Sequence, residues 1–215
     1  MAYLILALII LIPLIIFGAG FYYGNRRKSW HENQGEGAVR QLLTEFCEAS
    51  TSHFLNNVTL DYKDGTTQID HILITENGIL VIETKHYTGW LFAHERQPQW
   101  TQVIYKVKYK FLNPILQNQK HLKAVRHLLD FLPSDQIQGL VVFSGDAQFK
   151  TEIPRNVIHI EDLSSYVDDF RCGSLSLNRV QFCVGRLECK RLELTSQTDV
   201  EHQAYLERKF GETHD

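Results

Sequence analysis

The sequence predicts a mixed α/β domain, in which helices pack on a central β-sheet, preceded by one membrane-spanning helix. Two patterns indicate this: a long uncharged run at the N-terminus, and apolar residues that recur at strand and helix spacings in alternation along the rest of the chain. The 215 residues are 44% hydrophobic and 22% charged, as in a globular domain with an appendage. The formal net charge of −3 excludes a generally basic nucleic-acid coat, so nucleic-acid binding would need a local basic patch.

The first 24 residues predict a transmembrane anchor. Residues 2–21 carry no charged side chain, and about 20 apolar residues at roughly 1.5 Å each span a hydrocarbon core of roughly 30 Å. Pro13 is compatible with this, because membrane helices tolerate proline. The basic run Arg26-Arg27-Lys28 follows at once, and the positive-inside rule then places the rest of the chain in the cytoplasm. We expect a single-pass membrane protein with a cytoplasmic soluble domain; the alternative is a cleaved signal peptide that releases a secreted domain.

The soluble part begins after a polar linker at residues 25–34. Apolar residues at helical spacing predict helices at residues 35–49, 175–192 and 200–210. Asn113-Pro114 predicts the start of a further helix that runs to about residue 131, because asparagine is a good N-cap and proline suits the first helical position. Alternating or short apolar runs predict strands at residues 53–58, 67–74, 78–85, 103–111, 140–143 and 157–160.

One predicted hairpin carries three charged side chains among apolar neighbours. Its strands flank Glu76-Asn77-Gly78, a strong turn signal, with Asp70 on the first strand and Glu83 and Lys85 on the second. A four-residue loop places Asp70 opposite Glu83, and a two-residue Asn77-Gly78 turn places it opposite Lys85. Both registers put the three side chains on one side of the hairpin, with Cβ atoms roughly 4.5–8 Å apart, and only a three-residue loop would separate them.

These three side chains form a candidate metal site. Two carboxylates and a lysine on inner strands are costly unless they are paired or bind a metal. A divalent cation between Asp70 and Glu83 would relieve their repulsion, and oxygen ligands that leave room for water suit Mg²⁺. Lys85 could then orient or help to deprotonate a water molecule, or stabilise charge on a phosphate. The alternative is a structural salt bridge on a solvated face of the sheet.

A basic segment follows the hairpin. No acidic residue occurs between Arg96 and Leu129, and we expect the lysines of this segment to contact a nucleic-acid backbone. They form one stripe on the predicted strand at residues 103–111 and another along the next helix: Lys106, Lys108, Lys110, Lys120 and Lys123. The alternatives are an edge strand protected by lysines, or a surface that meets anionic lipid headgroups.

An aspartate followed by Glu-x-Lys at the end of the next strand resembles the core of the PD-(D/E)XK nucleases. More closely, residues 35–145 resemble the nuclease-related domain (NERD) family. The matching pieces are Gly35-Glu36-Gly37, residues 69–73, residues 78–85, Gly89-Trp90, Trp100, and Asn113-Pro114 followed by Gln117. One departure is Ile69, which stands where the superfamily name has proline.

The resemblance implies a restriction-endonuclease-like core at residues 35–145, with residues 146–215 as a C-terminal strand and helical extension that packs on it. It implies catalytic roles for Glu36, Asp70, Glu83, Lys85 and Gln117, with Asp70, Glu83 and Glu36 as ligands of Mg²⁺ or Mn²⁺. The expected function is metal-dependent hydrolysis of nucleic-acid phosphodiester bonds, in DNA rather than RNA, by a membrane-anchored endonuclease. The alternative is a non-catalytic, membrane-tethered module that binds nucleic acid or a protein partner.

Overall fold

The computed structural model describes residues 34–63 and 65–192. The predicted anchor at residues 1–24, the linker up to residue 33 and the predicted helix at residues 200–210 lie outside the described residues. Among the helices that are described, none is both long and apolar enough to cross a bilayer.

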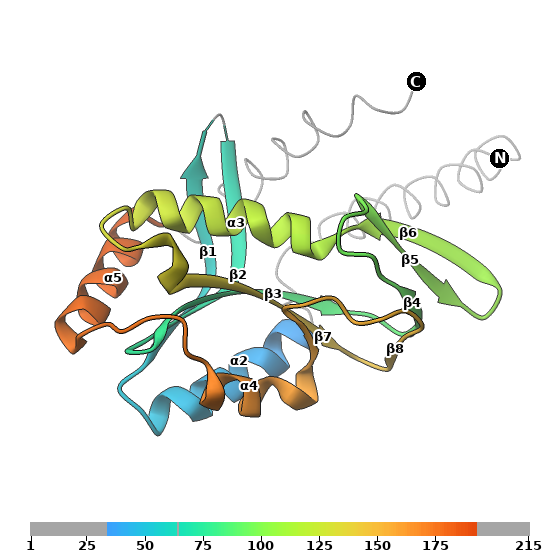
Figure 1. Ribbon diagram of the computed structural model, residues 1–215, viewed down its shortest axis with the longest axis horizontal. Helices are drawn as coiled ribbons and strands as arrows, with labels where there is room; N and C mark the ends of the chain where they lie inside the picture. The colour runs from blue at the N-terminus through green and yellow to red at the C-terminus, as the bar shows by residue number, and fades with distance from the viewer. Residues whose placement is uncertain (1–33, 64, 193–215) are drawn as a thin grey trace, which may run out of the picture. The chain divides into compact units, whose positions relative to one another are not determined.

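The larger of the two sheets in the described chain has the strand order β1-β2-β3-β7-β9 (Figure 1). Its first three strands form an antiparallel meander, and β7 and β9 lie parallel to β3. The strands are β1 (His53–Tyr62), β2 (Gly65–Thr75), β3 (Gly78–His86), β7 (Ile137–Ser144) and β9 (Val157–His159). Because parallel neighbours need a crossover, the long connection from β3 to β7 carries further structure.

Helices cover both faces of this sheet (Figure 1). On one face lie α3 (Pro114–Leu128) and α5 (Leu177–Lys190), and on the other lie α2 (Gln34–Glu48) and α4 (Leu163–Asp169). Short 3₁₀ turns span Ser134–Gln136 and Ile160–Asp162. Successive residues of β3 point to opposite layers: Val81 packs with Val125 of α3, and Leu80 packs with Val39 of α2. A strand buried on both faces reads as a continuous apolar run, as β3 does up to Glu83.

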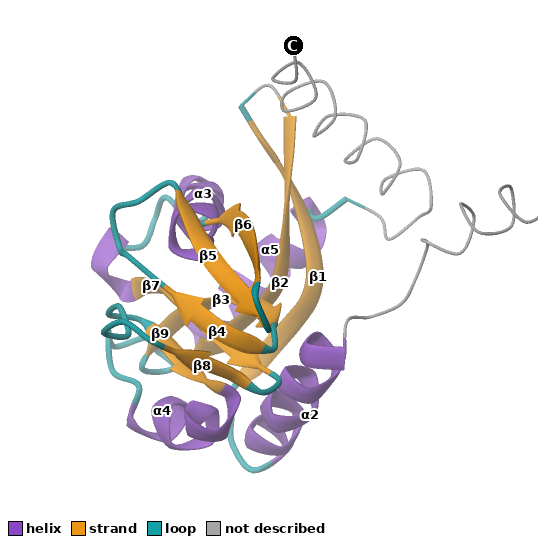
Figure 2. Cartoon of the chain, turned by 90° about the vertical axis from the view of Figure 1, so that its right-hand side faces the viewer, coloured by secondary structure: helices purple, strands orange, loops and turns teal. Residues whose placement is uncertain are grey.

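A smaller sheet with the order β6-β5-β4-β8 lies beside the larger one (Figure 2). Its strands are β4 (Gly89–Phe92), β5 (Gln99–Ile104), β6 (Val107–Leu112) and β8 (Ala147–Phe149). One face of this sheet packs through Leu91 and Trp100 against Phe143 of β7, and the ring of Trp100 stacks on that of Phe143 with centroids 6.0 Å apart. The small sheet is therefore fixed to the edge of the main core at the end of β3.

The mixed α/β class is confirmed, and the two sheets flanked by helices fit a restriction-endonuclease-like core. The predicted helices at residues 35–49, 113–131 and 175–192 correspond to α2, α3 and α5. The Asn113 side chain caps α3 by accepting from the backbone N–H of Ile115 at 2.9 Å, as the Asn-Pro pair predicts. The short elements β4, β8 and α4 were not predicted.

The single strand predicted at residues 103–111 is wrong. The chain folds back there as a hairpin, in which Ile104 pairs with Val107 and Tyr105-Lys106 forms the turn. The turn could not be predicted from its residues, because it contains neither glycine nor asparagine. Tyr105 takes the left-handed conformation there, with a φ of 55°. Alternation of apolar and charged residues also continues without a break through the turn.

The hairpin changes which side chains share a face. A single strand would place Val103 on the same face as Tyr109. In the hairpin Val103 pairs with Lys108, so it shares a face with Lys108 and Lys110 instead. The predicted stripe of three lysines is also wrong in one member, because Lys106 lies in the turn.

Candidate active site

The register of β2 and β3 is the one in which Asp70 lies opposite Glu83. The ladder runs from Thr75 paired with Gly78 to His71 paired with Ile82, and one further step in the same register brings Asp70 and Glu83 face to face. This confirms the register that was predicted for a four-residue loop. The reversal itself is tighter than a four-residue loop, because Thr75 and Gly78 still pair and Gly78 has a φ of 123°.

The carboxylate of Asp70 lies where the ladder between β2 and β3 stops. Backbone pairing ends at His71 and Ile82, and the backbone N–H of Thr84 instead donates to Oδ2 of Asp70 at 2.7 Å. The Asp70 side chain thus supplies the hydrogen-bond acceptor that the ladder does not provide for the N–H of the buried Thr84. It fixes the Asp70 carboxylate beside β3, next to Glu83.

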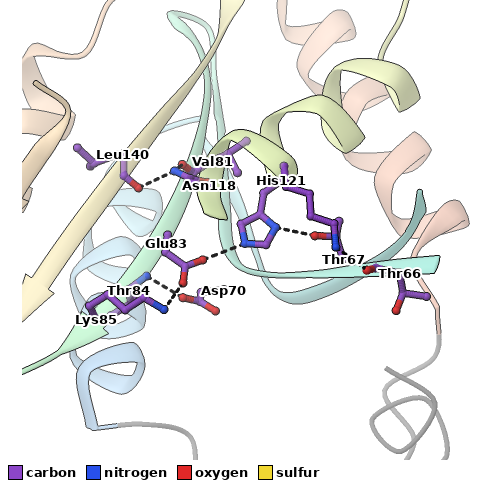
Figure 3. A network of polar contacts seen from close by, with 11 residues as sticks. Thr66, Thr67, Asp70, Val81, Glu83, Thr84, Lys85, Asn118, His121 and Leu140 are labelled. Carbon is purple, nitrogen blue, oxygen red and sulfur yellow. Dashed lines mark hydrogen bonds and ion pairs between the residues drawn. The ribbon is translucent and has the colours of Figure 1, made fainter. Parts of the chain in front are cut away.

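Glu83 is buried, with a relative exposure of 1%, and both of its oxygens have partners (Figure 3). Lys85 Nζ lies 2.6 Å from Oε1, and His121 Nε2 lies 3.0 Å from Oε2. The Lys85 side chain keeps 22% of its surface exposed, so its ammonium group lies between the buried carboxylate and solvent. A charge-assisted pair of this kind is retained in an apolar sheet because both groups are satisfied.

His121 is the member of this cluster that the sequence did not predict. It lies on α3, it is buried, and its Nδ1 lies 2.7 Å from the hydroxyl of Thr67 on β2. The carboxylate of Glu83 can only accept, so Nε2 carries the hydrogen in that bond. The signal for His121 was its position four residues before Val125, on the buried stripe of an amphipathic helix.

A buried asparagine holds α3 against the sheet. Nδ2 of Asn118 donates to the carbonyls of Val81 and Leu140, both at 3.0 Å, and so joins β3 and β7 (Figure 3). Gly139 of β7 makes room, because a Cβ there would lie only 3.0 Å from Asn118 Nδ2. These contacts set the height and rotation of the helix that carries His121.

Glu36 is brought to the site by the first turn of α2. The preceding Gly35 is buried against Thr84, His86 and Ser144, and a Cβ at this position would clash with the Ser144 hydroxyl. The helix can therefore approach the end of β3 closely. Glu36 then lies within electrostatic reach of Asp70, whose pKa its charge helps to raise.

The two carboxyl groups have pKa values shifted in opposite directions. Burial and the charges of Glu83 and Glu36 raise the pKa of Asp70 well above its ordinary value, and the Thr84 N–H and Lys85 only partly oppose this. Burial also acts to raise the pKa of Glu83, but the bonds from His121 and Lys85 outweigh it and leave that pKa lowered. The pKa of Lys85 is raised, because the attraction of Glu83 outweighs the effect of burial. Glu83 and Lys85 are thus a charged pair beside a carboxyl group whose ionised form is disfavoured.

These acidic residues fit a cation only in part. Across residues 34–63 and 65–192, no group of three or more histidine, cysteine, aspartate or glutamate side chains is arranged to hold a metal ion. Burial first, and then the charges of Glu83 and Glu36, raise the pKa of Asp70, and a cation beside it would oppose both effects. Mg²⁺ is commonly held by one or two carboxylates with water and substrate phosphate as its other ligands, so Asp70 and Glu83 fit this mode.

The remaining predicted residues do not gather at one place. Gln117 lies on α3 one turn before His121 and is partly buried. Lys120 turns to β2, where its Nζ lies 3.3 Å from the Thr66 carbonyl, and Lys123 is exposed on the same helix. Lys108 and Lys110 lie on β6 of the small sheet, so the predicted lysines of this segment come from two different elements.

The family model described as nuclease-related domain matches residues 31–144, which include all of β1–β3, the small-sheet hairpin and α3. The chain belongs to the nuclease-related domain family. The NERD match contains Glu36, Asp70, Glu83, Lys85 and Gln117, together with His121.

A relative of similar length extends this comparison beyond the NERD region. The chain is 30% identical over 194 residues to an uncharacterized protein of Bacillus anthracis, covering 85% of this chain and 86% of the relative. No solved structure matches the chain. The likeness thus continues past the NERD domain into the C-terminal part of the chain.

Proposed function

We propose that this NERD protein hydrolyses phosphodiester bonds of nucleic acid, preferentially DNA, with Mg²⁺ or Mn²⁺ as its cofactor. The observation that carries the proposal is the buried Glu83 carboxylate, bonded to Lys85 at 2.6 Å and placed opposite Asp70. A charged pair beside a second carboxylate is costly to bury, and a purely structural role would be met more cheaply by apolar side chains. Membership of the nuclease-related family supports the choice of phosphodiester chemistry.

Asp70 and Glu83 would hold the cation, with Glu36 as a third carboxylate of the same site. The cation would supply Lewis-acid stabilisation of the phosphate and lower the pKa of a bound water. Both oxygens of Glu83 already have partners, so binding of a cation requires Glu83 to share or exchange its bond to Lys85. Lys85 is the more mobile of the two partners, because part of its side chain is exposed.

Lys85 would act on the substrate with its ammonium group. Its pKa is raised, so it is a cation at neutral pH and is suited to stabilise negative charge that develops on a phosphate. The neighbouring His121 is a positioning residue, since it reaches the reaction through Glu83 and is itself oriented by Thr67. Gln117, one turn away on the same helix, would contact substrate from the side of α3.

We also propose that residues 1–24 anchor the protein in a membrane with the NERD domain on the cytoplasmic side. The support is the uncharged run at residues 2–21 followed by Arg26, Arg27 and Lys28. Such an anchor would limit cleavage to nucleic acid close to the membrane.

The experiment is a cleavage assay of the full-length protein in detergent, on single-stranded, duplex and branched DNA and on RNA, with Mg²⁺ or Mn²⁺. We expect Glu83→Gln and Lys85→Met each to lower the cleavage rate at least about 100-fold, because they remove charge at the reacting centre. Glu48→Gln and Lys190→Met are matched controls, since both residues are exposed on other helices. Cleavage that persists in both site variants would contradict the proposal. Binding of nucleic acid without cleavage under either metal would favour the non-catalytic module.

A further inference from the structure

The small sheet has a solvent face that combines aromatic and basic side chains. Residues paired directly across strands share a face, so one row contains Lys108, Val103, Trp90 and Gln148. The next row on the same face contains Lys110, Thr101 and Phe92.

The opposite face of this sheet enters the core through β4 and β5. Leu91 and Trp100 point inward and have relative exposures of 0% and 1%. By strand parity Trp90 points outward, and it is 50% exposed. Lys150 lies over the Trp90 ring, with Nζ 4.9 Å from the ring centroid, and also bonds to Gln148 at 3.1 Å. Trp90 therefore presents an aromatic surface to solvent with a cation beside it.

The tip of the hairpin adds a second exposed aromatic ring. Tyr105 has a relative exposure of 96% and a φ of 55°. Glycine or asparagine takes this backbone conformation with little strain, whereas tyrosine does so at a cost. No burial of the ring offsets this cost, so local stability does not explain a tyrosine here.

The charged residues within the four strands of this sheet are all lysines. The strands β4, β5, β6 and β8 contain no aspartate or glutamate. Lysines that protect the edge strand β6 from pairing would explain Lys108 and Lys110, but they would not explain an exposed Trp90 or a strained Tyr105. Exposed rings with lysines between them are the features by which proteins bind single-stranded nucleic acid: bases stack on the rings and phosphates meet the cations.

We propose that Trp90, Tyr105, Lys108, Lys110 and Lys150 form a platform that binds an unpaired strand of nucleic acid. The two rings stack on bases and the lysines contact the backbone, so the platform selects substrates with a single-stranded segment. This inference rests on the proposed function, because it assumes a nucleic-acid substrate and names its class.

The platform is joined firmly to the proposed active site. The four-residue step from Lys85 to Gly89 spans at most about 14 Å, and Gly89 packs so closely on the Val103 carbonyl that a side chain would clash there. Tyr87, between the two, stacks on Phe111 with ring centroids 4.5 Å apart. The platform is thus tied closely to the end of β3, the strand that carries Lys85.

The test measures binding rather than cleavage. Full-length protein in EDTA is titrated against a fluorescent oligothymidylate of about 16 nucleotides, in the range of known single-strand site sizes, and against a duplex of the same length. We expect tighter binding to the single strand. Trp90→Ala and Tyr105→Ala should each weaken it by about 5- to 100-fold, and Lys108→Gln with Lys110→Gln should reduce the slope of log K against log salt by about 1.4.

Phe182→Ala is the matched control, because this ring is 57% exposed on α5, away from the small sheet. Equal binding by the Trp90 and Tyr105 variants and the wild type, or a preference for duplex, would overturn the platform. The platform would also be overturned if the wild type bound vesicles of anionic lipid but not the oligonucleotide, and if these variants lost the binding to vesicles. The proposed function fails by a different result. If the protein binds the single strand as expected but does not cleave nucleic acid, the proposed catalysis is wrong and the platform stands. If the protein cleaves but the Trp90 and Tyr105 variants bind as well as the wild type, the platform is wrong and the catalysis stands.

Discussion

Asp70 and Glu83 lie opposite each other on neighbouring strands, yet their carboxyl groups have different surroundings. His121 and Lys85 compensate the charge of Glu83, whose pKa is lowered. Asp70 is raised in pKa by burial and by two neighbouring carboxylates, which the single bond from the Thr84 N–H only partly offsets. The ionised form of Asp70 is therefore disfavoured, and a bound cation would stabilise it.

The first prediction concerns Asp70→Asn. The amide keeps an oxygen for the Thr84 N–H but removes the cost of burying a charge and its repulsion from Glu83 and Glu36, so we expect the folded state to gain about 1 kcal/mol at pH 7. The melting temperature should rise by about 2–4 °C. Thermal unfolding without added metal measures this, and Asp169→Asn, exposed at the end of α4, is the control.

The pH dependence of this gain has a definite sign. The folded chain binds the Asp70 proton more tightly than the unfolded chain does, since the pKa is raised in the fold. Asp70 thus favours the folded state in acid, and this contribution is lost as the pH rises through its raised pKa. The gain from Asp70→Asn should therefore shrink as the pH falls towards the ordinary aspartate value of 3.8. A variant less stable than the wild type at pH 7 would contradict the raised pKa of Asp70.

At the scale of secondary-structure elements, three segments converge on the end of β3. The β2–β3 hairpin supplies Asp70, Glu83 and Lys85, α3 supplies His121, and α2 supplies Glu36. Small residues permit this convergence: Gly139 admits α3 and Gly35 admits α2. The position of each helix is therefore part of the site.

The second prediction tests the approach of α2. In Gly35→Ala the new Cβ would meet the Ser144 hydroxyl, so the first turn of α2 should move and carry Glu36 away from Asp70. We expect cleavage to fall at least about tenfold, as small displacements of a catalytic group cost about this much or more. Adding Ser144→Ala removes the obstructing oxygen and should restore much of the rate.

Gly185→Ala is the control for the helical effect of the substitution. Nothing lies within 4 Å of a Cβ at Gly185 of α5, so this change should only stabilise the helix, by about 0.5–1 kcal/mol. If Gly35→Ala cleaved at the wild-type rate, the close contact with Ser144 would have no part in placing Glu36.

For the molecule as a whole, local patterns in the sequence were sufficient for most of the larger sheet and for α3. The Asn113-Pro114 start is a local signal, and Glu76-Asn77-Gly78 restricts the hairpin to a few registers, two of which bring Asp70 and Glu83 together. The choice between those registers could not come from the turn residues. It depends on pairing along the whole length of β2 and β3.

The features that the sequence did not predict depend on distant or strained contacts. β8 and β4 are each only three or four residues long and pair across a long stretch of chain, so neither has a periodicity to read. The turn at Tyr105 breaks the usual preference for glycine or asparagine. The contact of His121 with Glu83 joins a helix to a strand 38 residues away in the chain, and only the packing of α3 creates it.

Metal-dependent hydrolysis at Asp70, Glu83 and Lys85 is the core of the proposed function. The most direct measurement is the single-turnover cleavage rate as a function of Mg²⁺ concentration, for the wild type and for Asp70→Asn, with EDTA as the zero point. We predict no cleavage in EDTA, a saturable rise with Mg²⁺, and a rate at least about 100-fold lower in Asp70→Asn. Cleavage in EDTA at the full rate, or a wild-type rate and Mg²⁺ midpoint in Asp70→Asn, would contradict it.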